Sequence, residues 1–361
     1  MKTYTDFLEN LQGKILLGCD GFVDETYEIV EVRKSQADFT PMKKLRQFGE
    51  LIVARADGGV GVELVPKRRC EGGFAINTGK VAACLGLKPL LPGLYGSPII
   101  DPAYEEFQDI CELASLGNPA LTIALEFGDG KVLMSNLEAV SSLTWKDFQK
   151  HFGEEKLKGL FSDVDILGLG YWSLTAHFDD LFEGFMGQYE TVQPPRRMFF
   201  DFADIKKKSN ESFMKSLALI RSFNGKIPMT LSLNEHEVLE LFSRIGLGHP
   251  ELTPEAITSA LTTAREKIGI DELVVHTPDF AAASNATEGE AYAIQDRQSN
   301  VIRLAGAGDS FNGGYLCASL GDLTPKERLV VANAVAAFFV THGTAPDKAA
   351  LLAQIEKASD K

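Results

Sequence analysis

The sequence predicts a three-layer α/β fold, in which helices cover both faces of a mostly parallel central sheet and a small β-sheet is appended to this core. Short apolar runs that end in Gly or Asp recur between helical stretches along the chain, an alternation typical of parallel strands joined by helices. Two other segments are richer in alternating and turn residues than in helical periodicity. The length of 361 residues accommodates one large core with an appendage.

Apolar runs give the expected strands of the central sheet: residues 14–18, 164–170, 198–201, 229–233 and 273–276. One helix between them has recognisable ends. Thr253 supplies an N-cap, Pro254 is a favoured first-turn residue, and Gly269 follows residues 255–267 as a stop.

The two segments that depart from this pattern span residues 25–69 and 121–142. The second contains two runs, 122–127 and 132–134, separated by Gly128-Asp129-Gly130, which is a hairpin signature. We expect both segments to form one small β unit. The expected domains are therefore a core of residues 1–24, 70–120 and 143–361 and a β appendage of residues 25–69 and 121–142.

Composition excludes several classes of partner. The formal net charge of −14 would repel a nucleic-acid backbone or an anionic membrane over the whole surface. The sequence shows neither the apolar stretch of an export signal nor a membrane-spanning run. The five cysteines are scattered without a CxxC pair, so neither a zinc site nor a disulfide framework is indicated. We expect a cytoplasmic protein that binds no nucleic acid and no membrane.

The residues richest in chemistry are Gly306-Ala307-Gly308-Asp309, which lead directly into an apolar helix. Such a loop points free backbone N–H groups at one spot, and the helix dipole adds to their attraction for an anion, so the loop is a phosphate cradle. Asp309 is either a helix cap or a carboxylate that takes a proton from a hydroxyl. The loop alone leaves these two readings level.

Three further motifs place polar groups beside turns. Gly72 and Gly73 precede an Ala-rich helix that carries Asn77; the glycines allow close backbone approach to a ligand, and the amide both donates and accepts. The alternative is a glycine turn before a packed helix. Asp20 and Asp24 follow the first strand, at the edge where open α/β sheets bind ligands. Solvated turn carboxylates are the alternative there.

The third motif is Asn234 with Glu237, directly after the expected strand 229–233. Amide and carboxylate oxygens suit Mg²⁺, which often meets protein groups through its waters. A capping box at an ordinary helix start explains the same two residues equally well.

Together these motifs resemble, in chain order, those of the ribokinase-like (PfkB) carbohydrate kinase family, from residue 14 to about residue 345. The resemblance implies a ribokinase-like fold whose β appendage is a lid over the acceptor. It implies transfer of the terminal phosphoryl of a nucleotide, ATP by expectation, to a hydroxyl of a sugar or sugar-like molecule. In this reading Asp309 is the base, and Gly306, Ala307 and Gly308 form the anion hole.

The resemblance also assigns the remaining roles. The expected acceptor-binding residues are Asp20, Asp24, Gly72, Gly73 and Asn77. The expected nucleotide-binding residues are Asn234, Thr277, Gly306, Gly308 and Asn333. Glu237 and Asn234 are expected to hold Mg²⁺ through water. A homodimer formed through the lid is a further expectation, because short exposed strands seek partners.

Two positions depart from the family pattern. Arg303-Leu304-Ala305 stands where members usually carry Asp-Thr, so activation by a monovalent cation is not expected. Pro278 stands where members have a glycine, which locks φ and removes an N–H. These departures keep alternatives open: a non-catalytic sugar or nucleotide sensor on the same fold, a nucleoside kinase, or a sugar kinase that uses ADP as donor.

Overall fold

The central sheet is mostly parallel, as the sequence predicts. The computed structural model describes residues 1–223, 225–295 and 297–359, and within them a nine-stranded sheet has the order β14-β13-β12-β11-β10-β9-β1-β5-β6. All neighbouring strands in the stretch β12-β11-β10-β9-β1-β5-β6 of this order are parallel. Strand β13 pairs antiparallel with both β12 and β14. Their bounds are β1 (Ile15–Gly18), β5 (Leu90–Gly93), β6 (Glu112–Ser115), β9 (Ile166–Leu169), β10 (Arg197–Asp201), β11 (Met229–Asn234), β12 (Glu272–His276), β13 (Phe280–Asn285) and β14 (Gly289–Ile294).

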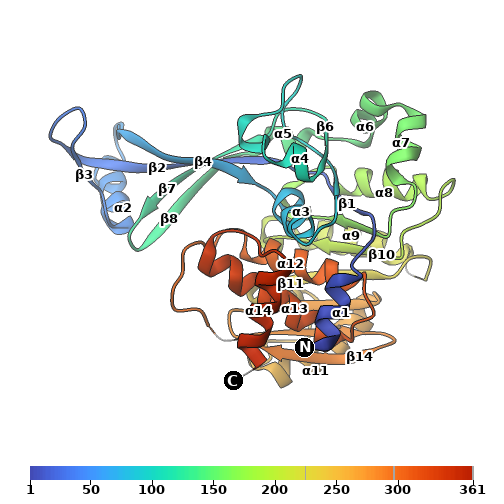
Figure 1. The fold of residues 1–361 in the computed structure, drawn as a ribbon. Coiled ribbons are helices and arrows are strands. Elements are labelled where there is room, and N and C mark those ends of the chain that lie inside the picture. Colours follow the sequence, from blue (N-terminus) through green and yellow to red (C-terminus); the bar gives the residue numbers. More distant parts are fainter. Residues whose placement is uncertain (224, 296, 360–361) are drawn as a thin grey trace.

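Helices cover both faces of this sheet (Figure 1). One face packs against α6 (Trp145–Phe152), α7 (Glu154–Phe161), α8 (Phe178–Gln188), α9 (Asn210–Ser222), α10 (Glu235–Arg244) and α11 (Pro254–Ile268). The other face packs against α1 (Lys2–Glu9), α3 (Phe74–Cys84), α4 (Phe107–Ile110), α12 (Ala307–Ala318), α13 (Pro325–His342) and α14 (Lys348–Ser359). Short 3₁₀ turns lie at η1 (Pro102–Tyr104), η2 (Trp172–Leu174) and η3 (Ile205–Lys207).

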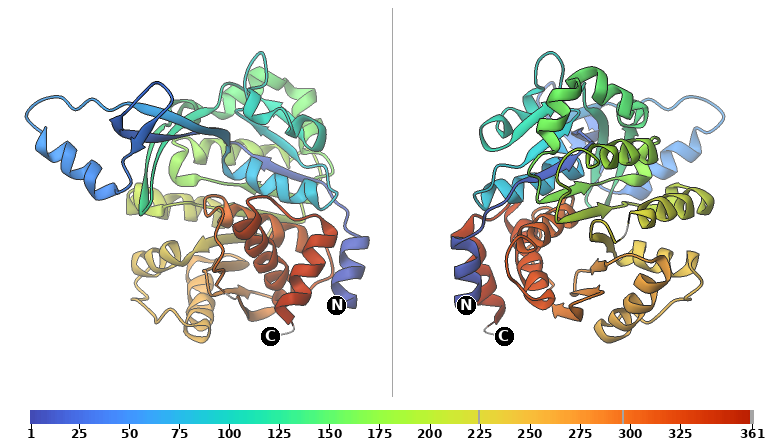
Figure 2. Two further views of the ribbon diagram at one scale, coloured as in Figure 1. Left: turned by 60° about the vertical axis from the view of Figure 1, so that its left-hand side comes forward. Right: turned by 90° about the vertical axis from the view of Figure 1, so that its right-hand side faces the viewer.

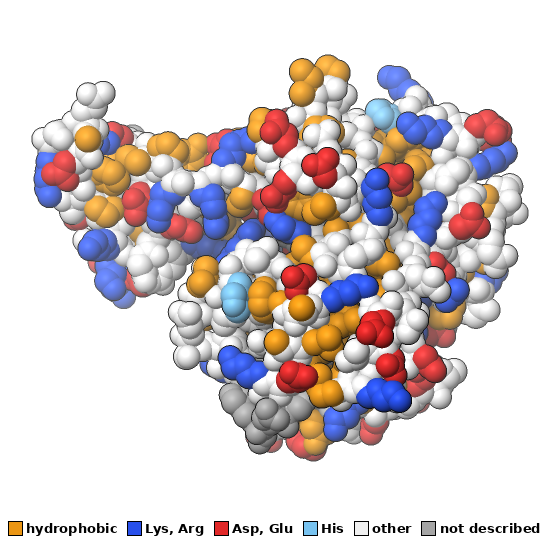
Figure 3. Space-filling model, viewed as in Figure 1, with side chains coloured by type: hydrophobic (Ala, Val, Ile, Leu, Met, Phe, Trp, Pro, Cys, Tyr) orange, Lys and Arg blue, Asp and Glu red, His pale blue; other side chains and the backbone are white. Residues whose placement is uncertain are grey.

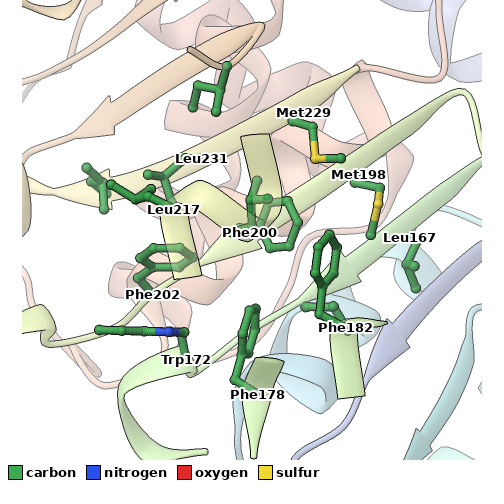
Figure 4. Close-up of a cluster of buried hydrophobic side chains, with 14 of the residues drawn as sticks. Leu167, Trp172, Phe178, Phe182, Met198, Phe200, Phe202, Leu217, Met229 and Leu231 are labelled. Atoms are coloured by element: carbon green, nitrogen blue, oxygen red, sulfur yellow. The ribbon is translucent and has the colours of Figure 1, made fainter. Parts of the chain in front are cut away.

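Each face of the sheet has its own apolar core because successive strand residues point to opposite sides. Figure 4 shows the first of these cores, where Phe178 and Phe182 of α8 pack beneath Met198 and Phe200 of β10. Phe199, between those two β10 residues, belongs to the core on the other face. The expected three layers are therefore present.

A second sheet projects from the core as a curved arm (Figures 1 and 2). We call it the lid sheet; it consists of β2 (Phe22–Arg33), β3 (Phe39–Pro41), β4 (Leu64–Gly72), β7 (Ala120–Phe127) and β8 (Gly130–Asn136). Its order is β3-β2-β7-β8, and β4 also pairs with β2. Helix α2 (Leu45–Ala54) packs at its far end, and α5 (Glu138–Ser142) follows β8.

Most elements that the sequence predicts are confirmed. All five expected strands of the central sheet are present, the helix begins at Pro254 behind the Thr253 cap and ends before Gly269, and β7 and β8 form the expected hairpin. We expected the segment 25–69 to form only β structure and turns, but it also contains the ten-residue helix α2. The structure shows no helix among its described residues that is long and apolar enough to cross a membrane.

Candidate active site

Polar residues line up along the carboxyl-terminal edge of the central sheet, where open α/β sheets bind their ligands. Asp20 follows β1, Tyr171 follows β9, and Asp201, Asn234 and His276 end β10, β11 and β12. These strands are neighbours in the sheet, in the order β12-β11-β10-β9-β1. The edge therefore presents a row of polar side chains from five adjacent strands.

Asp309 faces this edge from the first turn of α12. Its side chain is buried, and its Oδ2 atom accepts hydrogen bonds from Asn77 Nδ2 at 2.9 Å and from the Tyr171 hydroxyl at 3.3 Å. Thr78 Oγ1 donates to the Asp309 main-chain oxygen at 3.2 Å. The glycine-turn motif and the glycine-rich loop, 232 residues apart in the chain, thus meet at one carboxylate.

The environment of Asp309 favours its protonated form. Burial and the neighbouring Asp201 carboxylate raise the pKa of Asp309 to about 8, although Asn77 and Tyr171 both donate to it. A carboxyl group with a pKa near neutrality can both take up and release a proton at physiological pH. This is the property that a general base needs, and a simple helix cap on the surface does not have it.

The loop before Asp309 has the geometry of an anion site. Gly306 has a φ of 93°, which a residue with a side chain adopts only with strain, and a Cβ there would lie 3.2 Å from the Phe339 ring. The amides of Gly308 and Asp309 form no hydrogen bond that the structure records among its described residues. Free amides at a helix N-terminus attract anions. A Cβ on Gly308 would lie 3.1 Å from the His276 ring, and burial lowers the pKa of His276 to about 4, so this ring is neutral.

The predicted acceptor residues surround the start of α3. Both Asp20 oxygens are used locally: Oδ2 accepts from the Phe74 amide at 2.6 Å and Oδ1 from the Ala75 amide at 3.0 Å. A Cβ on Gly73 would lie 3.1 Å from Asp20 Oδ2, so the turn approaches this carboxylate closely. Burial raises the pKa of Asp20 to about 6. Asp20 caps α3 in this structure, and its acceptor role stays a prediction.

Asp24 lies on β2, at the root of the lid sheet, and is half-buried. A Cβ on Gly72 would lie 3.0 Å from its Oδ2 atom, which explains the second glycine of the turn. Burial raises the pKa of Asp24, while Thr122 and Arg303 lower it. Asp24, Gly72 and Asn77 are thus brought together on the lid side of Asp309.

A cavity of 590 Å³ opens on the opposite side of the loop. The anion loop contributes Ala307 and Gly308 to it, and β12 contributes His276. The remaining lining residues are Asn234, Glu235, His236, Thr277, Pro278, Gln295, Arg297, Gln298, Val301, Leu304, Phe311, Ala336 and Val340. The volume and mostly apolar lining are those of a small-molecule site.

Two predicted nucleotide residues lie at this end of the molecule. Thr277 lines the cavity, but its hydroxyl closes the β12–β13 turn by donating to the Phe280 oxygen at 2.9 Å. Asn333 lies on α13 and lines an adjacent cavity of 560 Å³. Its Nδ2 donates to the Ala293 oxygen at 3.2 Å, whereas its buried Oδ1 has no hydrogen-bond partner among the described residues.

Asn234 and Glu237 form the capping box that the sequence allows. Asn234 Oδ1 accepts from the Glu237 amide at 3.0 Å, and the Asn234 amide donates to Glu237 Oε2 at 2.9 Å. Yet Glu237 is buried and lines a 280 Å³ cavity that shares Asn234 and His236 with the larger one. Asn234 and Glu237 therefore cap α10 in this structure, and their role in binding Mg²⁺ stays a prediction.

A charge imbalance accompanies this capping box. Burial and the Asp201 carboxylate raise the pKa of Glu237 to about 9, and burial raises the pKa of Asp201 to about 6. No Lys or Arg pairs with either carboxylate in the part of the chain that the structure describes. The same residues contain no group of three or more His, Cys, Asp or Glu side chains close enough to hold a metal on their own. Two hard oxygen donors without a counter-charge suit a hydrated Mg²⁺ that other ligands also hold.

The family and the solved structures that this chain resembles include sugar and nucleoside kinases. Residues 5–358 match the family described as prokaryotic ketohexokinase. The chain belongs to the prokaryotic ketohexokinase family. It is similar to the ketohexokinase of Haloferax volcanii, with 27% identity over 338 residues, or 92% of this chain and 88% of that relative.

Solved structures agree on the fold of this prokaryotic ketohexokinase family member. Ribokinase of Arabidopsis thaliana, solved with ribose and ATP, has a TM-score of 0.67 at 16% identity, over 95% of this chain and 98% of its own. The nucleoside kinase of Methanocaldococcus jannaschii has a TM-score of 0.63 at 15% identity, over 96% and 99%. The ribokinase-like fold and the carbohydrate kinase family are thus confirmed. This chain is a carbohydrate kinase, and the alternative of a non-catalytic sensor loses its support.

Sequence reasoning missed two residues of this ketohexokinase-family site. Tyr171 donates to Asp309 from a left-handed conformation with a φ of 55°, which is strained for a tyrosine. Asp201 accepts from Asn312 Nδ2 at 2.7 Å and raises the pKa values of both Asp309 and Glu237. The available signal was position alone, because each residue ends or follows an expected strand without a recognisable motif.

Proposed function

We propose that this carbohydrate kinase transfers the terminal phosphoryl group of ATP to a hydroxyl of a ketohexose, with Asp309 as the base. The observation that carries the proposal is the 2.9 Å contact between Asn77 and Asp309, which joins the acceptor side of the site to the anion loop. The family match and the Haloferax volcanii ketohexokinase support a ketohexose as the acceptor.

The reaction follows from the placement of Asp309. The acceptor hydroxyl gives its proton to the Asp309 carboxylate as its oxygen bonds to the terminal phosphorus. The bond from that phosphorus to the bridging oxygen breaks, and ADP leaves with the electron pair. The free amides of Gly308 and Asp309 stabilise the charge on the transferring group. Asn77 and Tyr171 hold the carboxylate in position.

Mg²⁺ fits beside the capping box of α10. Asp201 and Glu237, with Asn234, supply hard oxygen donors that lack a cationic partner among the described residues. When bound, Mg²⁺ would neutralise the charge of the donor phosphates. These residues would hold it through water, as the sequence predicts for Glu237 and Asn234; Asp201 is added here from the structure.

The donor nucleotide is assigned to the 590 Å³ cavity. Gly308 and Ala307 line it on one side, so phosphates lying there would reach the free amides of the loop. Asn333, one helix away, lines the adjoining cavity and retains a free buried acceptor that suits an exocyclic amine of the base. Thr277 bounds the same space from the β12–β13 turn.

The lid sheet covers the acceptor and also suits a second copy of the chain. Asp24, at its root, lies on the acceptor side of the site, so closure of the lid over the sugar would exclude water. Figure 3 shows apolar side chains reaching the surface of the lid, which overhangs the core. Leu133 and Met134 on the edge strand β8 are 55% and 47% exposed. An apolar, unpaired edge supports a homodimer through the lid.

A coupled assay of nucleotide consumption tests this proposal. The purified protein is given Mg²⁺-ATP and, one at a time, ketohexoses, aldohexoses, pentoses and nucleosides. We expect sugar-dependent ADP formation that is fastest with a ketohexose. Faster turnover of a nucleoside, or turnover with ADP in place of ATP, would contradict the proposed acceptor or donor.

A further inference from the structure

The side chain of Arg303 is largely withdrawn from solvent, where a charge is costly. Its side chain is only 15% exposed, whereas its apolar neighbours Ile302 and Leu304 are 63% and 66% exposed. The chain thus turns a guanidinium inward and two large hydrophobic side chains outward. This arrangement is the reverse of what transfer energies favour, so it indicates that the guanidinium is needed at this place.

The guanidinium of Arg303 has spare hydrogen-bond donors. Its Nε atom is buried and has no hydrogen-bond partner, and no hydrogen bond from its guanidinium is recorded among the described residues. Its nearest acidic group, Glu71 Oε1, lies 3.9 Å from Nη1, beyond hydrogen-bond distance. Glu71 is itself buried, and its other cation, Lys80, is 3.6 Å away. A guanidinium carries five donors, so this one is poorly satisfied in the protein alone.

The position of Arg303 links the acceptor side of the site to the anion loop. Its guanidinium carbon lies 5.3 Å from the centre of the Phe339 ring, and that ring packs against Gly306. On the other side, its charge acts on Asp24 and Cys70, which pair with each other across β2 and β4. The guanidinium therefore lies between the root of the lid and the first residue of the loop.

We infer that Arg303 is a further acceptor-binding residue, whose guanidinium donates hydrogen bonds to oxygen atoms of the sugar. An oxygen-rich, uncharged polyol offers the acceptors that the free donors lack, and Asp24 accepts from hydroxyls of the same molecule. A carboxylate and a guanidinium side by side thus match hydroxyl groups that both donate and accept. This inference rests on the proposed function and names a residue that sets acceptor affinity.

Steady-state kinetics of Arg303→Gln and Arg303→Lys test the inference, with fructose as the ketohexose. We expect the Gln variant to raise the KM for fructose by about 10- to 100-fold, because a charged donor to the ligand is lost, and to leave the KM for ATP unchanged. The Lys variant should lie between the two, since an ammonium can donate but cannot form the fork. Arg196→Gln is the matched control, because Arg196 is 77% exposed and pairs with Asp165, before β9, at the opposite edge of the sheet.

Thermal unfolding without ligands separates binding from a structural role. Removal of a poorly paired buried charge should leave the Tm of the free Gln variant unchanged or raise it, and fructose should stabilise this variant less than the wild type. An unchanged KM for fructose, or a fall in Tm with equal rises in both KM values, would overturn the inference. A wild type that phosphorylates a different sugar would instead overturn the proposed ketohexose, and the same KM rise is then required with that sugar.

Discussion

Among single residues, Asp309 is a buried carboxyl group that accepts hydrogen bonds from two neutral donors and from no cation among the described residues. Asn77 and Tyr171 stabilise its ionised form, but burial and Asp201 outweigh them and raise its pKa to about 8. An Arg or Lys in the place of Asn77 or Tyr171 would lower the pKa of Asp309 further, because a positive charge favours the ionised carboxylate. The ionised form of Asp309 is therefore destabilised, and the group exchanges its proton near neutral pH.

A raised pKa makes the stability of the protein depend on pH. Asp309 has a pKa of about 8 in the folded protein and an ordinary value near 4 in the unfolded chain. Its contribution to stability is therefore fully present below about pH 4 and is lost as the pH rises through about 8. We expect Asp309→Asn, which cannot ionise, to gain Tm relative to the wild type between pH 5 and pH 9.

Asp101→Asn is the control of opposite sign for that measurement. Two hydrogen bonds from Arg69 lower the pKa of Asp101, so its contribution is present above about pH 4 and is lost in acid. Its Asn variant should lose Tm at neutral pH and approach the wild type in acid. If the difference in Tm between Asp309→Asn and the wild type did not change with pH, the raised pKa would be wrong.

The sequence predicts residues that stand in motifs and misses those that stand alone. Asp309, Asn77 and Asp24 belong to glycine-rich or acidic turns whose chemistry is readable before folding. Tyr171 and Asp201 become neighbours of Asp309 only because β9 lies beside β1, and β10 beside β9, in the sheet. Strand order is a long-range property, so no local pattern identifies either residue.

At the scale of elements, the start of α10 has two explanations that a pair of variants separates. Glu237 and Glu327 are both third-position glutamates of capping boxes, on α10 and α13. Glu237→Gln should raise the Mg²⁺ concentration for half-maximal activity by about tenfold, because an acidic outer ligand is lost. Titration of activity with Mg²⁺ checks this.

Glu327→Gln removes the same type of cap on α13, and Glu327 lines neither the 280 Å³ nor the 590 Å³ cavity, so this change should leave the Mg²⁺ titration unchanged. Identical titrations for the Glu237 and Glu327 variants would show that Glu237 acts only as a cap.

The glycine that starts α12 provides a second test at this scale. Gly306→Ala places a side chain at a φ of 93° and against the Phe339 ring. The strain should cost about 1–3 kcal/mol of stability and should also displace the anion loop, so kcat should fall. Gly153→Ala, with a φ of 73° and open space around it, should cost stability without loss of kcat. Equal activity in both variants would contradict the role of the loop.

Element prediction succeeds for apolar runs that turn residues bound, whatever their length, and fails for strands that themselves contain turn or small residues. The run 273–276 was predicted because apolar residues precede a Thr-Pro turn, and β12 is there. The strands β5 and β6 have four residues each, and β5 ends in Pro-Gly, which reads as a turn. Helix α2 was missed although Leu45, Phe48 and Ile52 are spaced as on one helical face, because the turn and alternating residues of the segment 25–69 around it favour β structure.

At the scale of the whole molecule, the proposed homodimer through the lid sheet is open to a direct test. The strand β8 has a free edge and carries Leu133. We expect the protein to sediment as a dimer and Leu133→Asp to shift it toward the monomer, because a charge on an apolar interface is strongly unfavourable. Ile99→Asp is the control, since Ile99 is 81% exposed outside the lid sheet. A wild type that is monomeric at all concentrations would contradict this assembly.

In the proposed arrangement, the two substrates bind on different sides of the core. The residues that we assign to the acceptor lie near β1 and the root of the lid, whereas the large cavity lies near β12 and α13. Asp309 stands between them, on the helix that follows the anion loop. The order of the motifs in the chain predicts that the acceptor and the nucleotide lie on different sides of Asp309. It does not predict the position of Arg303 near the lid, because an arginine next to a glycine-rich loop is usually expected at the surface.

The most direct test of the account is single-turnover transfer from ATP to fructose by Asp309→Asn. We predict that the rate of transfer falls by about 10²–10⁴-fold while the Kd for Mg²⁺-ATP is unchanged, because the variant keeps the loop amides and loses only the base. A variant that transfers the phosphoryl group at nearly the wild-type rate would show that Asp309 is not the base.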